Sequence, residues 1–175
     1  NDGSGWNYGR GKQADNPEYL FLREVDYCSG ACIALKTKYF HQIGALDERY
    51  APAYYEDTDL AFKVRESGFK VFIQPLAAVI HHEGITSGTD TASGAKKYQL
   101  VNQKKFVERW QDELKSQPER ITNPDDAAEV RRAGRHFGKG RILVVDATTP
   151  EPDKDSGSVR LTNLMQCCRD LGYNL

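Results

Sequence analysis

The chain has 175 residues, of which 39% are hydrophobic and 28% are charged. This length and composition indicate one globular domain, or one domain with an appendage, and exclude a disordered tail. The 24 Lys and Arg residues nearly balance the 25 Asp and Glu residues, which argues against a nucleic-acid-binding protein. No run of about 18 apolar residues occurs, so the sequence predicts no membrane span.

The N-terminus and the cysteines indicate the setting of the chain. It begins at Asn1, without Met and without the basic and apolar regions of a signal peptide, which predicts a piece of a longer protein. Some functional residues are then expected outside it. The four cysteines lack the spacing of a zinc site, so we interpret them as reduced thiols of a cytoplasmic protein.

The first half of the chain predicts alternating strands and helices. Residues 31–35 (ACIAL) are predicted to form a buried strand. A short helix is predicted over residues 37–43, ended by a glycine. A second helix is predicted over residues 56–67, with three acids in its first turn, where the helix dipole favours negative charge. A strand is predicted over residues 69–73.

The second half predicts two longer helices and a change of character near residue 141. Residues 83–95 are predicted to be a loop, and residues 96–114 the longest helix. Residues 141–146 (RILVVD) predict a parallel-sheet strand, followed by a helix over residues 158–171. One apolar stripe is expected on the helix over residues 96–114, made of Leu100, Val107, Trp110 and Leu114.

Two clusters carry residue types that do chemistry. Glu56, Asp57 and Asp59 follow two tyrosines at a helix start, where a carboxylate held in its charged form suits a general base; the same acids are also explained as helix capping. His81 and His82, followed by an acid, form a candidate site for a divalent cation, although such a pair at a strand end is often plain surface.

Four short motifs, taken in order, carry a resemblance to a known family. They are residues 26–31 (DYCSGA), 44–48 (GALDE), 55–60 (YEDTDL) and 79–84 (VIHHEG). In this order and at these distances they resemble the C-terminal half of a family-2 glycosyltransferase of the GT-A fold. The stretch that follows, with Asn102, Phe106 and Trp110, is similar to the subgroup that builds bacterial surface polysaccharides.

The resemblance implies an α/β fold made of two truncated parts. Residues 1–115 would be part of a GT-A (nucleotide-diphospho-sugar transferase) domain, and residues 116–140 a linker with a short helix. Residues 141–175 resemble the first strand, loop and helix of a second, Rossmann-like domain of the GT-B type. The family's N-terminal half, with the DxD metal motif, is absent from this chain, so we expect no turnover from it alone.

For function, the resemblance implies a hexosyltransferase-type enzyme. It would transfer a sugar with inversion from a nucleotide-diphosphate sugar to a hydroxyl of a saccharide or lipid-linked saccharide, in O-antigen or capsule-type biosynthesis. Asp57 would be the general base, with Glu56 and Asp59 orienting the loop and helix and Asp59 as second candidate. The residues expected to bind the donor or the acceptor are Ser29, Gly30, Tyr54 and Tyr55. His81 is expected to bind a Mg or Mn ion.

Three further expectations concern the whole protein. It is expected to be cytoplasmic, with a peripheral position at the inner membrane face as a second option. Unpaired strand edges and the apolar segment 141–146 predict self-association. The alternative function is a non-catalytic carbohydrate-binding or assembly module derived from a transferase.

Overall fold

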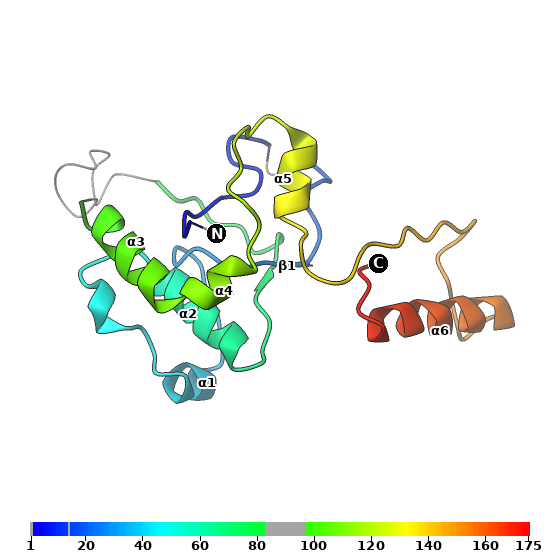
Figure 1. Cartoon of the computed structure of the whole chain (residues 1–175). Coiled ribbons are helices and arrows are strands. Elements are labelled where there is room, and N and C mark those ends of the chain that lie inside the picture. Colours follow the sequence, from blue (N-terminus) through cyan, green and yellow to red (C-terminus); the bar gives the residue numbers. More distant parts are fainter. Residues whose placement is uncertain (1, 14, 83–96) are drawn as a thin grey trace. The chain divides into compact units, whose positions relative to one another are not determined.

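The structure is a computed structural model that describes residues 2–13, 15–82 and 97–175. The chain divides into two compact units, Asn1–Arg135 and His136–Leu175, and the division lies inside the segment predicted as a linker. The described residues combine helices with a small sheet, a mixed composition compatible with the α/β class (Figure 1). The predicted loop over residues 83–95 lies outside the described residues.

The first unit contains most of the regular structure. Its elements in chain order are β1 (Arg23–Glu24), α1 (Thr37–Gln42), the 3-10 turn η1 (Glu48–Tyr50), α2 (Glu56–Glu66), β2 (Phe72–Ile73), α3 (Lys97–Arg109), α4 (Gln111–Lys115) and α5 (Ala127–Ala133). Strands β1 and β2 pair antiparallel, with Arg23 opposite Ile73. The predicted helix over residues 56–67 is confirmed as α2, and Gly68 follows its end with φ +80°, a conformation that glycine adopts without strain.

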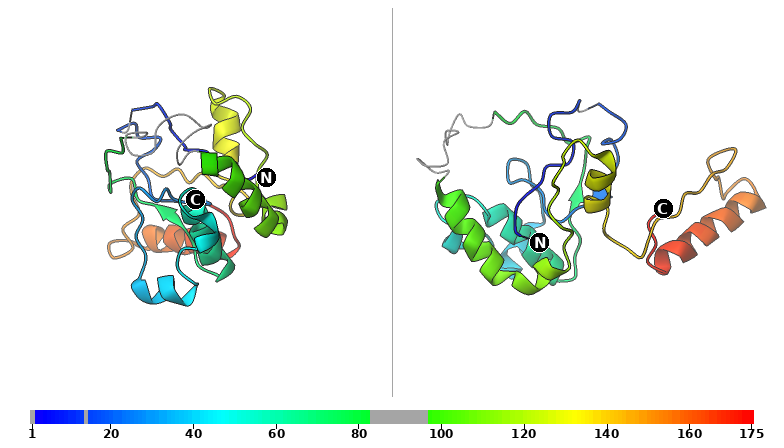
Figure 2. Two further views of the ribbon diagram at one scale, coloured as in Figure 1. Left: turned by 90° about the vertical axis from the view of Figure 1, so that its left-hand side faces the viewer. Right: turned by 45° about the horizontal axis from the view of Figure 1, so that its top comes forward.

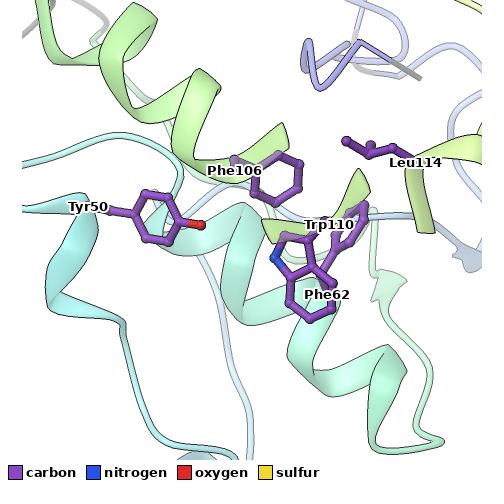
Figure 3. Packing of buried hydrophobic residues seen from close by; sticks show 5 residues of the cluster. All are labelled: Tyr50, Phe62, Phe106, Trp110 and Leu114. Atoms are coloured by element: carbon purple, nitrogen blue, oxygen red, sulfur yellow. The ribbon is translucent and has the colours of Figure 1, made fainter. Parts of the chain in front are cut away.

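The core of this unit lies between α2 and the pair α3 and α4 (Figures 2 and 3). The Phe62 ring lies 5.0 Å from that of Phe106 and 5.4 Å from that of Trp110. Tyr50 and Leu114 complete the buried cluster. Phe106, Trp110 and Leu114 are thus buried at intervals of four residues, which is the spacing of one helical face.

The predicted stripe on α3 was wrong in part. Trp110 and Leu114 are buried and Val107 packs against the core, as expected, but Leu100 is 59% exposed. The fully buried positions on α3 are Asn102 and Phe106. The helical period is compatible with a buried stripe that contains Leu100 and with one that contains Asn102. The packing of α3 against α2 buries the stripe that contains Asn102.

Two predicted strands of the first unit were wrong or too long. Residues 31–35 form no strand, and Ile33 is 41% exposed. The strand predicted over residues 69–73 is reduced to β2. A buried strand needs neighbours on its edges and cover on its faces, and within the described residues the only sheet has two short strands.

The second unit consists of α6 (Ser156–Asp170) and the extended segments beside it. Asp155 caps this helix by accepting hydrogen bonds from the Ser158 backbone N–H at 2.8 Å and from its hydroxyl at 2.6 Å. The strand predicted over residues 141–146 is absent: a single parallel bridge joins Arg141 to Asn174. The helix predicted over residues 158–171 is confirmed, and it begins two residues earlier.

Two observations concern the chain as described. None of the helices in the described ranges has the length and apolar character that crossing a membrane requires. All four cysteines are free thiols.

Candidate functional site

The backbone before α2 has an unusual conformation. Tyr54 and Tyr55 both have φ near 75°, in the left-handed region that residues other than glycine rarely adopt. Two such residues in succession cost on the order of 1–3 kcal/mol each, and they persist only where the surroundings hold them. The acids of α2 follow directly, so this turn sets the direction in which they face.

Asn102 of α3 holds that turn in place. Its side chain is fully buried, and Nδ2 donates hydrogen bonds to the carbonyl oxygens of Tyr50 at 2.7 Å, Ala53 at 2.8 Å and Tyr54 at 3.1 Å. The two N–H groups of this amide are thereby shared among three carbonyls of an irregular segment.

Tyr55 is anchored rather than open. Its hydroxyl donates to the Gly3 carbonyl at 2.8 Å, and its ring lies 5.3 Å from that of Phe106. Burial raises the pKa of Tyr55 to about 12, and the charges of neighbouring groups add to the rise. Tyr54 is half-buried. Of the two predicted sugar-binding tyrosines, Tyr55 therefore supports the site, because its polar group is already bonded to the protein.

Asp57 and Gly30, 27 residues apart in the sequence, meet at the start of α2. Asp57 Oδ2 accepts a hydrogen bond from the Gly30 N–H at 2.7 Å, and Oδ1 accepts one from the Thr58 N–H at 2.7 Å. A Cβ added to Gly30 would lie 3.2 Å from the Asp57 Cβ, so glycine permits this close approach. Ser29 is exposed, and its hydroxyl accepts a bond from the Ala31 N–H. The half-buried Asp57 carboxylate is thus held by backbone donors from two segments.

Glu56 lies beside an open hollow of about 260 Å³. Its Oε2 is buried and has no hydrogen-bond partner among the described residues. Burial raises the pKa of this carboxyl, the charge of Asp57 raises it further, and backbone hydrogen bonds from Glu56 and Tyr54 oppose the rise. The other residues that line the hollow are Leu46, Asp47, Glu48, Tyr50, Ala51 and Pro52.

Asp59 is fully buried within a network of partners. Its Oδ1 accepts hydrogen bonds from the Tyr50 hydroxyl at 3.1 Å and from Trp110 Nε1 at 2.9 Å. Lys63 Nζ lies 3.5 Å from Oδ2, and Arg109 Nη1 lies 3.4 Å from Oδ1. A carboxylate placed in this way joins α2 to α3 and η1, and it has no exposed surface for a substrate hydroxyl to approach.

The predicted metal site remains incomplete in the described part of the chain. His81 and His82 are exposed, and the acid that follows them lies outside the described residues. Among residues 2–13, 15–82 and 97–175, no group of three or more His, Cys, Asp and Glu side chains could hold a metal ion. The described residues do not fit a complete divalent-cation site, and His81 as a metal ligand stays a prediction.

Sequence reasoning missed two residues that shape this site. The family resemblance includes Asn102 without indicating a role for it, and the sequence indicates no role for Tyr50. The signal for Asn102 was a polar residue four positions before Phe106 and eight before Trp110, because a polar residue on a buried stripe has backbone or side-chain partners. No comparable signal exists for Tyr50, since its partner Asp59 is found only from the packing of η1 on α2.

Comparisons with known proteins give a partial match. The chain is 38% identical over 71 residues to an N-acetylglucosaminyl-diphospho-decaprenol L-rhamnosyltransferase of Mycobacterium tuberculosis, in two strains. This match covers 41% of the chain and 23% of the relative. The chain is also 33% identical over 60 residues to the uncharacterized protein y4gI of Sinorhizobium fredii. This second match covers 34% of the chain and 7% of that protein. No family model and no solved structure matches.

The matched stretch spans less than a quarter of the length of the mycobacterial enzyme. Over that part, the chain is similar to a glycosyltransferase.

Proposed function

We propose that this chain is the acceptor-side part of a family-2 glycosyltransferase with the GT-A fold, and that Asp57 is its general base. The observation that carries the proposal is the position of Asp57 in the first turn of α2. Backbone donors hold both of its carboxylate oxygens, beside a strained aromatic turn. The similarity to a rhamnosyltransferase supports the same reaction class.

In the proposed reaction, Asp57 removes the proton from an acceptor hydroxyl. The acceptor oxygen then forms a bond to the anomeric carbon of the donor sugar, and the bond from that carbon to the nucleotide diphosphate breaks with inversion. A carboxylate with little freedom of movement suits this role, because a general base acts only within hydrogen-bond reach of the proton. The nucleotide-binding half and any DxD motif would lie outside these 175 residues.

The acceptor that we propose is a saccharide or lipid-linked saccharide. The name of the mycobacterial relative describes transfer of L-rhamnose to an N-acetylglucosaminyl-diphospho-decaprenol. Surface-polysaccharide assembly of the O-antigen or capsule type, and a cytoplasmic position, belong to the same proposal. Residues 141–175 would begin a second, GT-B-like domain.

The test is a nucleotide-sugar assay on a full-length protein that contains this chain. Asp57→Asn should leave folding intact and reduce turnover by about 100- to 10,000-fold, because a positioned general base is lost. Asp112→Asn is the matched control, since Asp112 is 77% exposed and pairs with Lys115 on α4. Near-normal turnover of Asp57→Asn would assign the base to Glu56, because Asp59 is inaccessible. Saccharide binding without turnover of any nucleotide sugar would favour the alternative, a non-catalytic carbohydrate-binding module.

A further inference from the structure

A second cluster of functional side chains lies in the first unit, between the N-terminal segment and the end of α5. We call it the arginine–aromatic cluster, and it consists of Tyr8, Tyr19, Phe21, Arg23 and Arg135. The Arg23 guanidinium lies 4.5 Å from the centre of the Tyr8 ring and 5.6 Å from that of Phe21. The Arg135 guanidinium lies 5.3 Å from the Phe21 ring. Figure 1 shows α5 beside the N-terminal segment.

The packing of this cluster depends on glycines at two close contacts. The rings of Tyr8 and Tyr19 meet edge to face at 5.3 Å. A Cβ on Gly9 would lie 3.1 Å from the Tyr19 ring, and one on Gly134 would lie 3.1 Å from the Tyr8 ring. Such distances are shorter than most Cβ contacts, so these two glycines allow the segments to approach and fix the rings on which the arginines rest.

The two arginines have no acidic partner. Within the ranges that the structure describes, no carboxylate lies within ion-pairing distance of Arg23 or Arg135, and Arg135 Nε is buried without an acceptor. Glu18 contacts the cluster through the Tyr8 hydroxyl at 3.4 Å, but it is also paired with Arg131. Burial lowers the pKa of the Arg23 guanidinium, and the nearby positive charge of Arg135 lowers it further. Two cations held close together without an anion are a site that an anion would stabilise.

We propose that the arginine–aromatic cluster binds a diphosphate group. A guanidinium stacked on a ring keeps its N–H edge available, and that planar edge matches two oxygens of a phosphoryl group. Two such edges, from β1 and from the end of α5, suit a ligand with two linked phosphoryl groups. Carboxylate ligands are less suited, because one carboxylate occupies only one of the two edges.

This site is separate from the catalytic proposal, since it involves neither Asp57 nor turnover. The diphosphate has two natural sources in saccharide assembly: a nucleoside diphosphate, and an isoprenyl diphosphate of a lipid-linked saccharide. Both present the same anionic group to the arginines, and they differ in what the neighbouring aromatic rings would contact.

Calorimetric titration of the 175-residue chain with inorganic pyrophosphate tests the proposal, at constant ionic strength set with sodium chloride. We expect saturable binding that Arg23→Gln and Arg135→Gln each weaken about tenfold or more, the effect of losing hydrogen bonds to a charged group. Arg120→Gln is the matched control, because Arg120 is 70% exposed and lies outside the cluster. Circular dichroism shows whether each variant is folded. If Arg135→Gln misfolds, Arg135→Lys replaces it, because lysine keeps the charge but lacks the planar N–H edge.

Two further arms use uridine diphosphate and geranyl diphosphate in place of pyrophosphate. Tighter binding of one of them than of pyrophosphate identifies the source, and equal binding shows that the diphosphate alone is recognised. The proposal is overturned if pyrophosphate does not bind at millimolar concentration, or if the Arg120 variant weakens binding as much as the cluster variants do.

Discussion

Burial separates the three acids at the start of α2 into different roles. Asp59 is enclosed with two cations and two neutral donors, so its charge is compensated and its position fixed. Asp57 is half-buried and bonded to backbone N–H groups. Glu56 has one oxygen buried without a partner. Of these three carboxylates, Asp59 therefore has a structural role, and Asp57 and Glu56 remain available for chemistry.

The unpartnered oxygen of Glu56 has a consequence for stability. The pKa of Glu56 is raised in the folded state, so the protonated form is favoured by folding and the contribution of this group is lost as pH rises above its ordinary value near 4.5. We expect Glu56→Gln to stabilise the protein at pH 7 by less than about 1 kcal/mol, because solvent screens a half-exposed group. The gain should disappear below pH 4.5.

Urea unfolding at pH 4 and pH 7 measures this difference. Glu119→Gln serves as the control, since Glu119 is exposed and lies away from the hollow. A loss of stability at pH 7 in Glu56→Gln would mean that the carboxylate has a partner that its described surroundings do not provide.

At the scale of elements, α3 supports the turn before α2. Asn102 lies on the same stripe as Phe106 and Trp110, so the contacts that form the core also position the Asn102 amide next to the turn. The strain of Tyr54 and Tyr55 is thereby balanced by hydrogen bonds from a neighbouring helix rather than from their own segment. Substitutions on α3 should consequently alter the positions of the acids in the first turn of α2.

Asn102→Ala tests this coupling. The variant removes one buried amide and leaves three carbonyls without a donor, which should lower the free energy of unfolding by about 2–4 kcal/mol. Hydrogen exchange should accelerate at the turn over residues 50–55 more than in the second half of α2. Gln99→Ala, at an exposed position of α3, should change neither measurement by much. Uniform acceleration across the unit would show that Asn102 stabilises the core without a particular role in the turn.

The helices were predictable from the sequence, whereas two of the three predicted strands are absent and the third is shortened to β2, for a physical reason. Local signals define helices: the acids that begin α2 and Gly68 that follows it lie within one turn of its ends. Strands depend on partners that are distant in the sequence, and the segments over residues 31–35 and 141–146 have no such partners among the described residues. The acids of the candidate site were found from their pattern, whereas Asn102 and its three acceptors required the packing of α3.

At the scale of the whole molecule, the second unit leaves much of its apolar surface uncovered. Leu143 is 87% exposed and Val145 is 83% exposed, and they lie two residues apart on one face of an extended segment. No residue of α6 is buried. Exposed apolar residues beside an unpaired backbone edge favour association between chains, and a net charge of −1 gives little repulsion to oppose it.

We expect the 175-residue chain to self-associate through this segment as its concentration rises. Replacing Leu143 and Val145 together by lysine should shift the mass measured by light scattering towards that of the monomer, because two charges on one face of this segment oppose edge-to-edge pairing between chains. Thr148→Lys adds a charge at an exposed polar position nearby and should leave the mass unchanged, which separates loss of apolar surface from added charge. A chain that stays monomeric over the whole concentration range would contradict the prediction, and it would mean that the exposed apolar face is too small to overcome the entropy lost on association.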